Sequence, residues 1–227
     1  MPVYQLDDRL WFPPEEEYEE HGVIAIGGDL SVSRLVLAYQ MGVFPWYNSD
    51  EPITWWSPFK RMVLKPGEVK ISKSSRNLLN RNLFTIKFDT AFEEVLNHCQ
   101  KIKRKNQDGT WLNEELKSSI LDLHQLGLAH SVECWKGKEL VGGLYGISMG
   151  KMFFGESMFS LESNASKIAF IALCKKLESL NFNWVDCQIH NPYLESLGAY
   201  EISRTAFLAE IKSNELASTL RGSWQNI

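Results

Sequence analysis

The sequence predicts an α+β fold with a mainly antiparallel sheet, and the order of its strand and helix patterns carries this prediction. Three strand-like runs at residues 130–135, 140–147 and 152–158 are joined by turn signals at Gly137 and Gly150, a spacing that suits an antiparallel meander. Helical patterns lie before and after the meander rather than between its strands, and such segregation is typical of the α+β class. The 227 residues allow one large domain or two unequal ones.

The first sixty residues differ in composition from the rest of the chain. They hold six of the eight prolines and four of the eight tryptophans, so we expect a loop-rich, aromatic segment. One helix is expected at residues 31–41, capped by Ser31 or Ser33 and ended by Gly42. Regular elements take over from about residue 61, so we predict a small N-terminal domain, 1–60, and a larger C-terminal domain, 61–227.

Capping residues predict where the remaining helices begin. Before the meander the expected caps are Ser72, then Asp89 or Thr90, then Asn113. After the meander we expect, in order, a helix at 162–180, a strand at 184–189, a short helix at 191–198, a strand at 200–203 and a last helix capped by Thr205.

Composition excludes several classes of protein. With 44% hydrophobic and 23% charged residues, the chain resembles ordinary globular proteins. It has neither an apolar run long enough to span a membrane nor a basic start followed by an apolar stretch, and we expect a cytoplasmic protein. The four cysteines form no CxxC pair and the five histidines show no HxH or HxxxH spacing, which favours free thiols and no metal site.

Positive charge is concentrated in one stretch of an acidic protein. The net charge is −4, yet residues 60–110 hold twelve Lys or Arg against five Asp or Glu. The densest part is the basic cluster formed by Lys101, Lys103, Arg104 and Lys105. Such a stretch predicts a surface that holds a polyanion; the alternative is a solvated helix end whose cations complement the helix dipole.

Two short segments place acidic and amide side chains inside strand-like runs. Glu156 lies in Gly155-Glu156-Ser157-Met158-Phe159-Ser160, and Asp186 and Gln188 lie in Val185-Asp186-Cys187-Gln188. A carboxylate among apolar neighbours is costly to desolvate without a partner, so these residues are candidates for a functional site. The alternative for Asp186 is a structural one, in which it bonds backbone amides at a strand end.

The order of elements and the residues in them resemble the leucyl/phenylalanyl-tRNA-protein transferases. The resemblance runs from Phe12-Pro13-Pro14 to Phe207-Leu208. The matching segments are Gly27-Gly28-Asp29-Leu30, Gly42-Val43-Phe44-Pro45-Trp46-Tyr47, Trp55-Trp56-Ser57-Pro58, Gly109-Thr110-Trp111, Ala129-His130-Ser131-Val132-Glu133, Val141-Gly142-Gly143-Leu144-Tyr145-Gly146, Gly155 to Ser160, Asn164-Ala165-Ser166-Lys167, Asp186-Cys187-Gln188 and Ser196-Leu197-Gly198-Ala199.

The resemblance implies both a fold and a reaction. It implies a C-terminal domain with the acetyltransferase-superfamily (GNAT-like) fold. It also implies a monomer that moves leucine or phenylalanine from aminoacyl-tRNA to the α-amino group of proteins beginning with Lys or Arg, which marks them for degradation. An aminoacyl ester is already activated, so no cofactor is expected, and the chain has no GxxxxGK[ST] loop.

By resemblance, the catalytic residues are Asp186 as the base and Gln188 as the residue that orients the amine or the carbonyl. An exposed Asp is a weak base, so Asp186 needs burial or a neighbouring carboxylate such as Glu156 to raise its pKa. An equally physical role for Asp186 is to hold the cationic N-terminus of the acceptor. The expectation is that Asp186→Ala folds normally and loses transfer.

The resemblance also implies residues that bind the donor. Leu144, Met158, Val185 and Phe170 are candidates for an apolar pocket, with core packing as the alternative for each. Glu156 is a candidate for the free α-amino group of the substrate, and Trp111 for stacking on the terminal adenine. Ser157 and Asn191 complete the expected substrate contacts, and Lys73 and Arg76 join the basic cluster as expected tRNA contacts.

Two departures from the family pattern and three rival classes accompany this prediction. The chain has Lys70-Ile71-Ser72-Lys73-Ser74 where the family commonly has His-x-Ser-Arg-Ser, and it lacks a Pro near Ser203. The first rival is a non-catalytic module that binds aminoacyl-tRNA or peptide. An acyl-CoA acetyltransferase is disfavoured because no [QR]xxGx[GA] turn is present, and a serine hydrolase because Ser157 lacks the second glycine of a nucleophile elbow.

Overall fold

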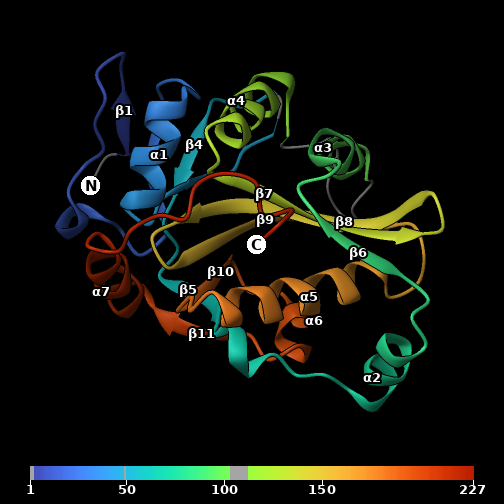
Figure 1. The fold of residues 1–227 in the computed structure, drawn as a ribbon. Helices are drawn as coiled ribbons and strands as arrows, with labels where there is room; N and C mark the ends of the chain where they lie inside the picture. Colours follow the sequence, from blue (N-terminus) through green and yellow to red (C-terminus); the bar gives the residue numbers. More distant parts are fainter. Residues whose placement is uncertain (1–2, 49, 103–111) are drawn as a thin grey trace.

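The computed structural model describes residues 3–48, 50–102 and 112–227, which form two sheets with helices around them (Figure 1). The smaller sheet has four strands in the order β1-β2-β4-β3, and the larger has seven in the order β11-β5-β10-β9-β8-β7-β6. The larger sheet is antiparallel except where β9 and β10 pair in parallel. The predicted α+β class with a mainly antiparallel sheet is therefore confirmed.

The N-terminal segment contains more strands than its sequence predicted. Its strands are β1 (Tyr4–Leu6), β2 (Val23–Gly27), β3 (Phe44–Pro45) and β4 (Thr54–Trp56). The short 3-10 helix η1 (Glu15–Glu17) lies between β1 and β2, and α1 (Val32–Gln40) lies between β2 and β3. The prediction of one helix was confirmed, with Ser31 accepting a bond from the backbone N–H of Arg34. The loop-rich description holds, since less than half of the described residues in this segment lie in helices or strands. The strands were missed, because strands of two to five residues are too short to show an alternating pattern.

The meander was predicted correctly, and its strands are longer than expected. They are β7 (Ala129–Lys136), β8 (Glu139–Met149) and β9 (Met152–Ser160). The strand β6 (Thr85–Phe88) pairs with β7, and β10 (Trp184–Gln188) lies between β9 and β5 (Lys60–Leu64). Beyond β5 lies β11 (Tyr200–Ser203). Strands β5 and β6 were not predicted, because their partners lie far along the chain.

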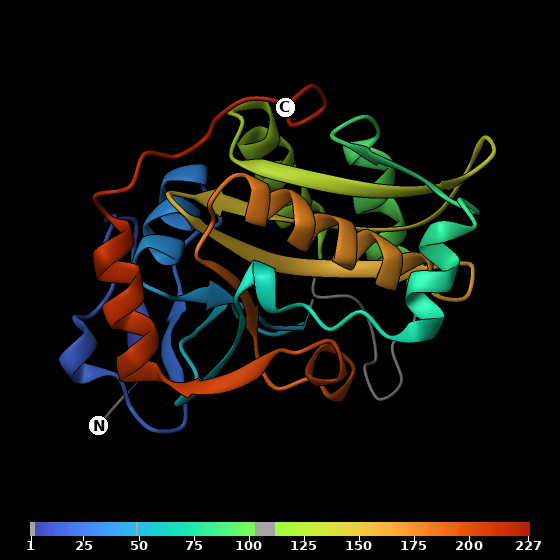
Figure 2. The ribbon, with the colours of Figure 1, turned by 60° about the horizontal axis from the view of Figure 1, so that its bottom comes forward.

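The helices cover both faces of the larger sheet (Figures 1 and 2). Helix α5 (Ala165–Ser179) lies on one face, and α3 (Phe92–Lys101) and α4 (Glu114–Gln125) lie on the other. The buried side chains accordingly form two clusters, one containing the inner faces of α3 and α4 and the other the inner face of α5. The remaining helices are η2 (Pro66–Glu68), α2 (Lys73–Asn80), α6 (Pro192–Ser196) and α7 (Arg204–Asn214).

Besides Ser31, the predicted caps Ser72 and Asn113 are confirmed, since their side chains accept backbone N–H bonds at the starts of α2 and α4. Asn191, where the short helix was predicted to begin, caps α6 in the same way. The caps predicted for two other helices are wrong. Helix α3 instead begins after Ala91, and the buried Glu133 of β7 accepts the backbone N–H of Thr90 there. Helix α7 is capped by Ser203 rather than by Thr205. The sequence could not indicate the first change, because Glu133 lies on a distant strand.

The segment after α7 returns to the larger sheet. Trp224 is fully buried and its ring stacks on His130, with 3.9 Å between the ring centroids. Its backbone N–H donates to Asp89 Oδ2 at 2.6 Å, and the same carboxylate oxygen is 2.9 Å from His130 Nδ1. The Phe153 ring of β9 also lies 5.9 Å from this indole, measured between ring centroids. The C-terminal segment is thereby fixed against β9, the strand that carries Glu156.

Within the residues that the structure describes, no helix is both long and apolar enough to cross a membrane. Nor do three His, Cys, Asp or Glu side chains gather anywhere in them so that they could hold a metal ion. The four cysteines are free thiols, of which Cys187 alone is not fully buried.

Candidate active site

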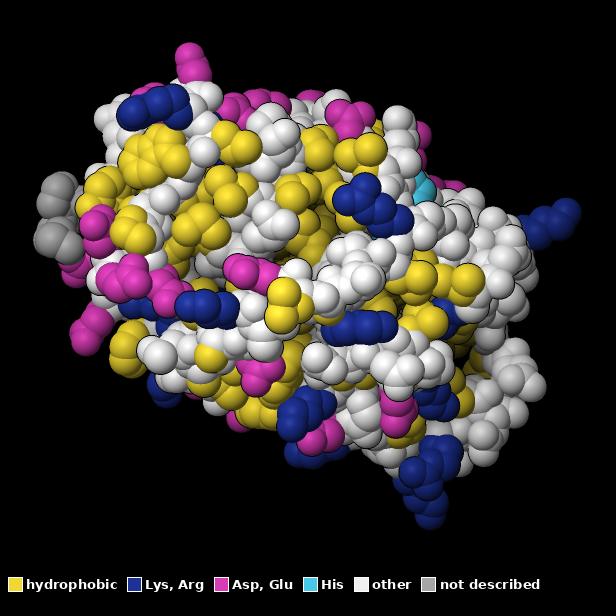
Figure 3. Space-filling view, turned by 60° about the vertical axis from the view of Figure 1, so that its left-hand side comes forward, with side chains coloured by type: hydrophobic (Ala, Val, Ile, Leu, Met, Phe, Trp, Pro, Cys, Tyr) yellow, Lys and Arg dark blue, Asp and Glu magenta, His cyan; other side chains and the backbone are white. Residues whose placement is uncertain are grey.

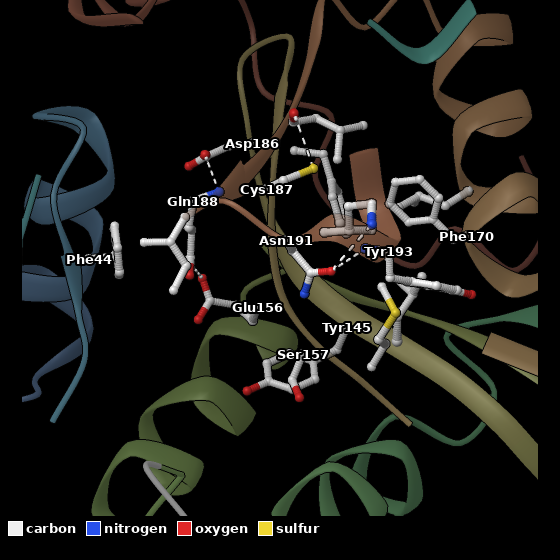
Figure 4. Close-up of a pocket in the computed structure, with 18 of the residues that line it drawn as sticks. Phe44, Tyr145, Glu156, Ser157, Phe170, Asp186, Cys187, Gln188, Asn191 and Tyr193 are labelled. Atoms are coloured by element: carbon white, nitrogen blue, oxygen red, sulfur yellow. Dashed lines mark hydrogen bonds between the residues drawn. The ribbon is translucent and has the colours of Figure 1, made fainter. Parts of the chain in front are cut away.

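A pocket lies where the parallel strands β9 and β10 separate (Figure 4). Their pairing extends to Asp186 opposite Phe154, after which β9 continues to Ser160 and β10 ends at Gln188. The space between the strands is a cavity of about 360 Å³. Its walls come from β8, β9, β10, α5 and α6, and from residues 44–46 of the smaller sheet. Figure 3 shows hydrophobic side chains gathered in and around a hollow on one face of the molecule.

Irregular strand pairing produces the separation. The β8–β9 register shifts between Tyr145 and Gly146, and the β10–β5 register shifts between Asp186 and Gln188. A Cβ at Gly146 would lie 2.3 Å from the carbonyl oxygen of Phe154, so the close approach of β8 and β9 at this point requires glycine. Gln188 adopts a φ of 64°, a left-handed conformation that is uncommon for a residue with a side chain.

The polar side of the pocket is built on Glu156. Gln188 Nε2 donates to Glu156 Oε1 at 2.9 Å, and the Tyr39 hydroxyl of α1 also bonds to this carboxylate. The pKa of Glu156 is raised to about 8, chiefly by burial and also by the nearby negative charge of Asp186, against the opposing effects of Tyr39, Arg61 and Gln188. Glu156 therefore changes its protonation state near neutral pH.

Asp186 is placed differently from the base that the sequence led us to expect. Its side chain is fully buried, and Arg61 donates from Nε to Oδ1 at 2.8 Å and from Nη2 to Oδ2 at 2.6 Å. Oδ1 also accepts the backbone N–H of Gln188 at 2.8 Å. Asp186 is therefore buried, as a base would need, but it is paired with Arg61, and Glu156 is a second carboxyl at this site with a raised pKa. The role of Asp186 as the base stays a prediction.

Sequence reasoning missed Arg61. It lies on β5 with 1% of its surface exposed, and its guanidinium lies over the rings of Phe44 and Phe207. The one signal in the sequence is a charged residue at the start of the apolar run Met62-Val63-Leu64. That signal gives no indication of the partner, which is 125 residues away.

Comparison with known proteins identifies the family. The sequence model described as leucyl/phenylalanyl-tRNA protein transferase matches residues 63–212, and that of the N-terminal domain of the same proteins matches residues 28–58. The leucyl/phenylalanyl-tRNA–protein transferase of Flavobacterium johnsoniae is 52% identical over 93% of this chain and 100% of its own length. The chain belongs to the leucyl/phenylalanyl-tRNA protein transferase family. The protein of that name from Syntrophobacter fumaroxidans is 47% identical over 94% of this chain and 92% of its own length.

Membership of this transferase family makes the chain an enzyme that transfers aminoacyl groups from tRNA to protein. The predicted substrate contacts within the described residues all line the pocket, namely Leu144, Glu156, Ser157, Met158, Phe170, Val185 and Asn191. The two predicted catalytic residues, Asp186 and Gln188, line it as well. Asn191 is also a cap, since its side chain accepts the backbone N–H groups of Tyr193 and Leu194. Their contact with substrate stays a prediction.

The pocket of the transferase has a wall that was not predicted. Phe44, Pro45 and Trp46 reach it from β3 and the residue after it, so the smaller sheet contributes directly to the site. The other unpredicted lining residues are Tyr145, Phe153, Gly155, Leu173, Cys187, Ile189, Tyr193 and Leu194. The matching segment Gly42 to Tyr47 was a signal that could have indicated this wall.

The predicted tRNA contacts lie away from the pocket or outside the described residues. Lys73 and Arg76 are exposed on α2, and Lys101 is exposed at the end of α3; none of the three lines the pocket. Lys103, Arg104, Lys105 and Trp111 lie outside the described residues. Their roles remain proposals.

Proposed function

We propose that this enzyme moves leucine or phenylalanine from aminoacyl-tRNA to the α-amino group of proteins beginning with Lys or Arg, and so marks them for degradation. The observation that supports this activity is a pocket whose walls are largely apolar and whose polar side carries Glu156 and Gln188. An apolar cavity accepts a leucyl or phenylalanyl side chain, and a carboxyl with a pKa near the operating pH is suited to proton transfer.

In the proposed mechanism, the amine nitrogen of the acceptor attacks the ester carbonyl carbon of the donor. The new C–N bond replaces the C–O bond to the ribose, the amine loses a proton, and the ribose oxygen gains one. Glu156 accepts the proton from the amine, and Gln188, which donates to Glu156 through Nε2, presents its carbonyl oxygen to the amine. Much of the acceleration comes from alignment, since the ester is already activated. Asp186 acts on the reaction through Gln188.

From the family we also propose that the chain is divided into a domain at residues 1–60 and a GNAT-like domain at residues 61–227. We propose further that the enzyme acts as a monomer and is located in the cytoplasm, where aminoacyl-tRNA is made. The meander, the long helix α5 and the parallel strand β10 support the fold assignment. The pocket needs no second chain for its walls, which supports a monomer.

Transfer of labelled leucine from leucyl-tRNA to short peptides tests the function. Peptides beginning with Arg or Lys are expected to be labelled, whereas the same peptides with an acetylated N-terminus and peptides beginning with Glu are not. Binding of leucyl-tRNA by the folded protein without any transfer would support the non-catalytic module instead.

The size of the apolar pocket is expected to set the preference between donors. Met158→Ala removes a flexible wall residue, so we expect the ratio of phenylalanyl to leucyl transfer to rise about 10-fold, in the range seen when hydrophobic pockets lose methylene groups. The ratio of the two kcat/KM values measures it. Met149→Ala is the matched control, because Met149 is buried at the end of β8 and lies outside the pocket. An equal change in both variants would show that Met158 does not line the donor site.

The exposed cations of α2 are expected to contact tRNA phosphates. Replacing Lys73 and Arg76 together by Gln should lower the slope of log affinity for leucyl-tRNA against log salt by about 1 to 2, because each phosphate contact contributes about 0.7 to 0.9. Titrations of the tRNA at several salt concentrations measure the slope. Lys212→Gln is the control, since Lys212 is exposed on α7, away from α2 in Figure 1. An unchanged slope in the double variant would remove α2 from the tRNA surface.

A further inference from the structure

Arg61 connects the two sheets at the pocket. Its guanidinium carbon lies 4.6 Å from the centroid of the Phe44 ring and 4.4 Å from that of the Phe207 ring. Nη1 donates to the carbonyl oxygen of Gly42 at 3.2 Å, while Nε and Nη2 both bond to Asp186. Every nitrogen of this buried side chain therefore has a defined acceptor, and the side chain has one orientation.

Asp186 links Arg61 to the backbone of Gln188 by hydrogen bonds. The oxygen that accepts Arg61 Nε also accepts the Gln188 backbone N–H at 2.8 Å. Gln188 lies at the register shift of β10 with a φ of 64°, a conformation that persists only where surrounding contacts hold it. If the backbone of Gln188 were extended instead, its side chain would no longer point toward Glu156.

We propose that Arg61 is a positioning residue for the transfer reaction: through Asp186 it fixes the left-handed backbone of Gln188 and thereby the Gln188–Glu156 pair. The chain of contacts is continuous, because Gln188 Nε2 lies 2.9 Å from Glu156 Oε1. Arg61 itself does not line the pocket, so it acts through Asp186. This inference rests on the proposed role of Glu156 and Gln188 in transfer.

The charge of Arg61 also acts on Glu156. The groups that face Glu156 are Tyr39 on α1, Gln188 and Asp186 on β10, and Arg61 on β5. Asp186 raises the pKa of Glu156 and Arg61 lowers it. Removal of Arg61 alone is therefore expected to move the rising limb of the pH–rate profile to higher pH, a change that a purely structural role would not produce.

The experiment compares transfer of leucine from leucyl-tRNA to an Arg-starting peptide by four proteins. They are the wild type, Arg61→Met, the double variant Arg61→Met with Asp186→Leu, and Arg34→Met. The double variant removes the whole buried pair, which spares it an unpaired charge. Arg34 is the matched control: it is 1% exposed and bonded to Asp29 and to backbone carbonyls of the N-terminal segment, and it does not line the pocket.

Each variant is assayed at a temperature at which circular dichroism shows it folded. For Arg61→Met and for the double variant we expect kcat to be about 100-fold lower than in wild type and KM for leucyl-tRNA to stay within about 3-fold. This is the pattern expected when the donor still binds but the reacting groups are no longer aligned. Arg34→Met should keep kcat within about 2-fold. Wild-type kcat in the folded double variant, or an equal loss in Arg34→Met, would overturn the proposal for Arg61. Failure of the wild type to transfer would instead overturn the proposed function.

Discussion

Glu156→Gln is expected to fold normally and to lower kcat for transfer by about 100-fold or more, the size of effect that general acid–base groups have. Glutamine preserves the shape of the side chain but cannot accept the proton of the attacking amine. Single-turnover transfer from leucyl-tRNA measures this rate. If Glu156 instead holds the free amino group of the donor, the main change will be a raised KM with kcat retained.

The matched control for this prediction is Glu133→Gln. Glu133 is also a buried carboxyl whose pKa is raised by burial, but it bonds Ser131 and Thr90 near the start of α3 and does not line the pocket. We expect its kcat to stay near that of wild type. A transfer rate that falls equally in both variants would point to damage of the sheet rather than to lost chemistry.

The raised pKa of Glu156 also predicts how stability depends on pH. The folded pKa of about 8 exceeds the ordinary value of 4.5, so the folded protein binds more protons than the unfolded chain between these two values. The stability of wild type relative to Glu156→Gln should therefore fall as pH rises from about 4.5 to about 8, and stay constant above that. Thermal unfolding of both proteins across this range measures the difference without any assay of transfer.

Asp186→Ala is expected both to lower kcat for transfer by about 100-fold and to destabilise the protein by about 3 to 5 kcal/mol. The sequence alone led us to expect normal folding of this variant. The structure leads us to expect lower stability instead, because Asp186 has a buried guanidinium partner. Its removal leaves Arg61, which is 1% exposed, with an uncompensated charge. Urea unfolding gives the loss of stability, and the transfer assay below the unfolding transition gives the loss of rate.

Asp29→Ala provides the comparison for Asp186→Ala. Asp29 pairs with the equally buried Arg34, but 43% of the Asp29 side chain is exposed and Arg34 keeps the carbonyl oxygens of Asp7 and Arg9 as acceptors. We expect a loss of about 1 to 2 kcal/mol and unchanged transfer. An unfolding free energy of Asp186→Ala within about 1 kcal/mol of wild type would show that Arg61 finds another acceptor or reaches water.

Local patterns in the sequence were sufficient for most of the larger sheet and its helices. Turn glycines at 137 and 150 and the runs between them indicated the meander, and side-chain caps such as Ser72 and Asn113 indicated helix starts. These signals act between residues close along the chain, which is why they can be read without a structure. The strands β5 and β6 escaped, because a strand of four or five residues is defined by its partners.

The sequence by itself determined the family, the α+β class and the identity of the two charged segments that meet at the pocket, because ordered motifs and isolated carboxylates are properties of the chain. Only the tertiary structure decided which carboxylate carries the raised pKa. That outcome depends on the burial of Glu156, which raises its pKa more than the bonds from Tyr39 and Gln188 lower it, and on Arg61, which is 125 residues from Asp186 and pairs with it. Desolvation and charge pairing are fixed by neighbours in space, and those neighbours are supplied here by the larger sheet and by α1.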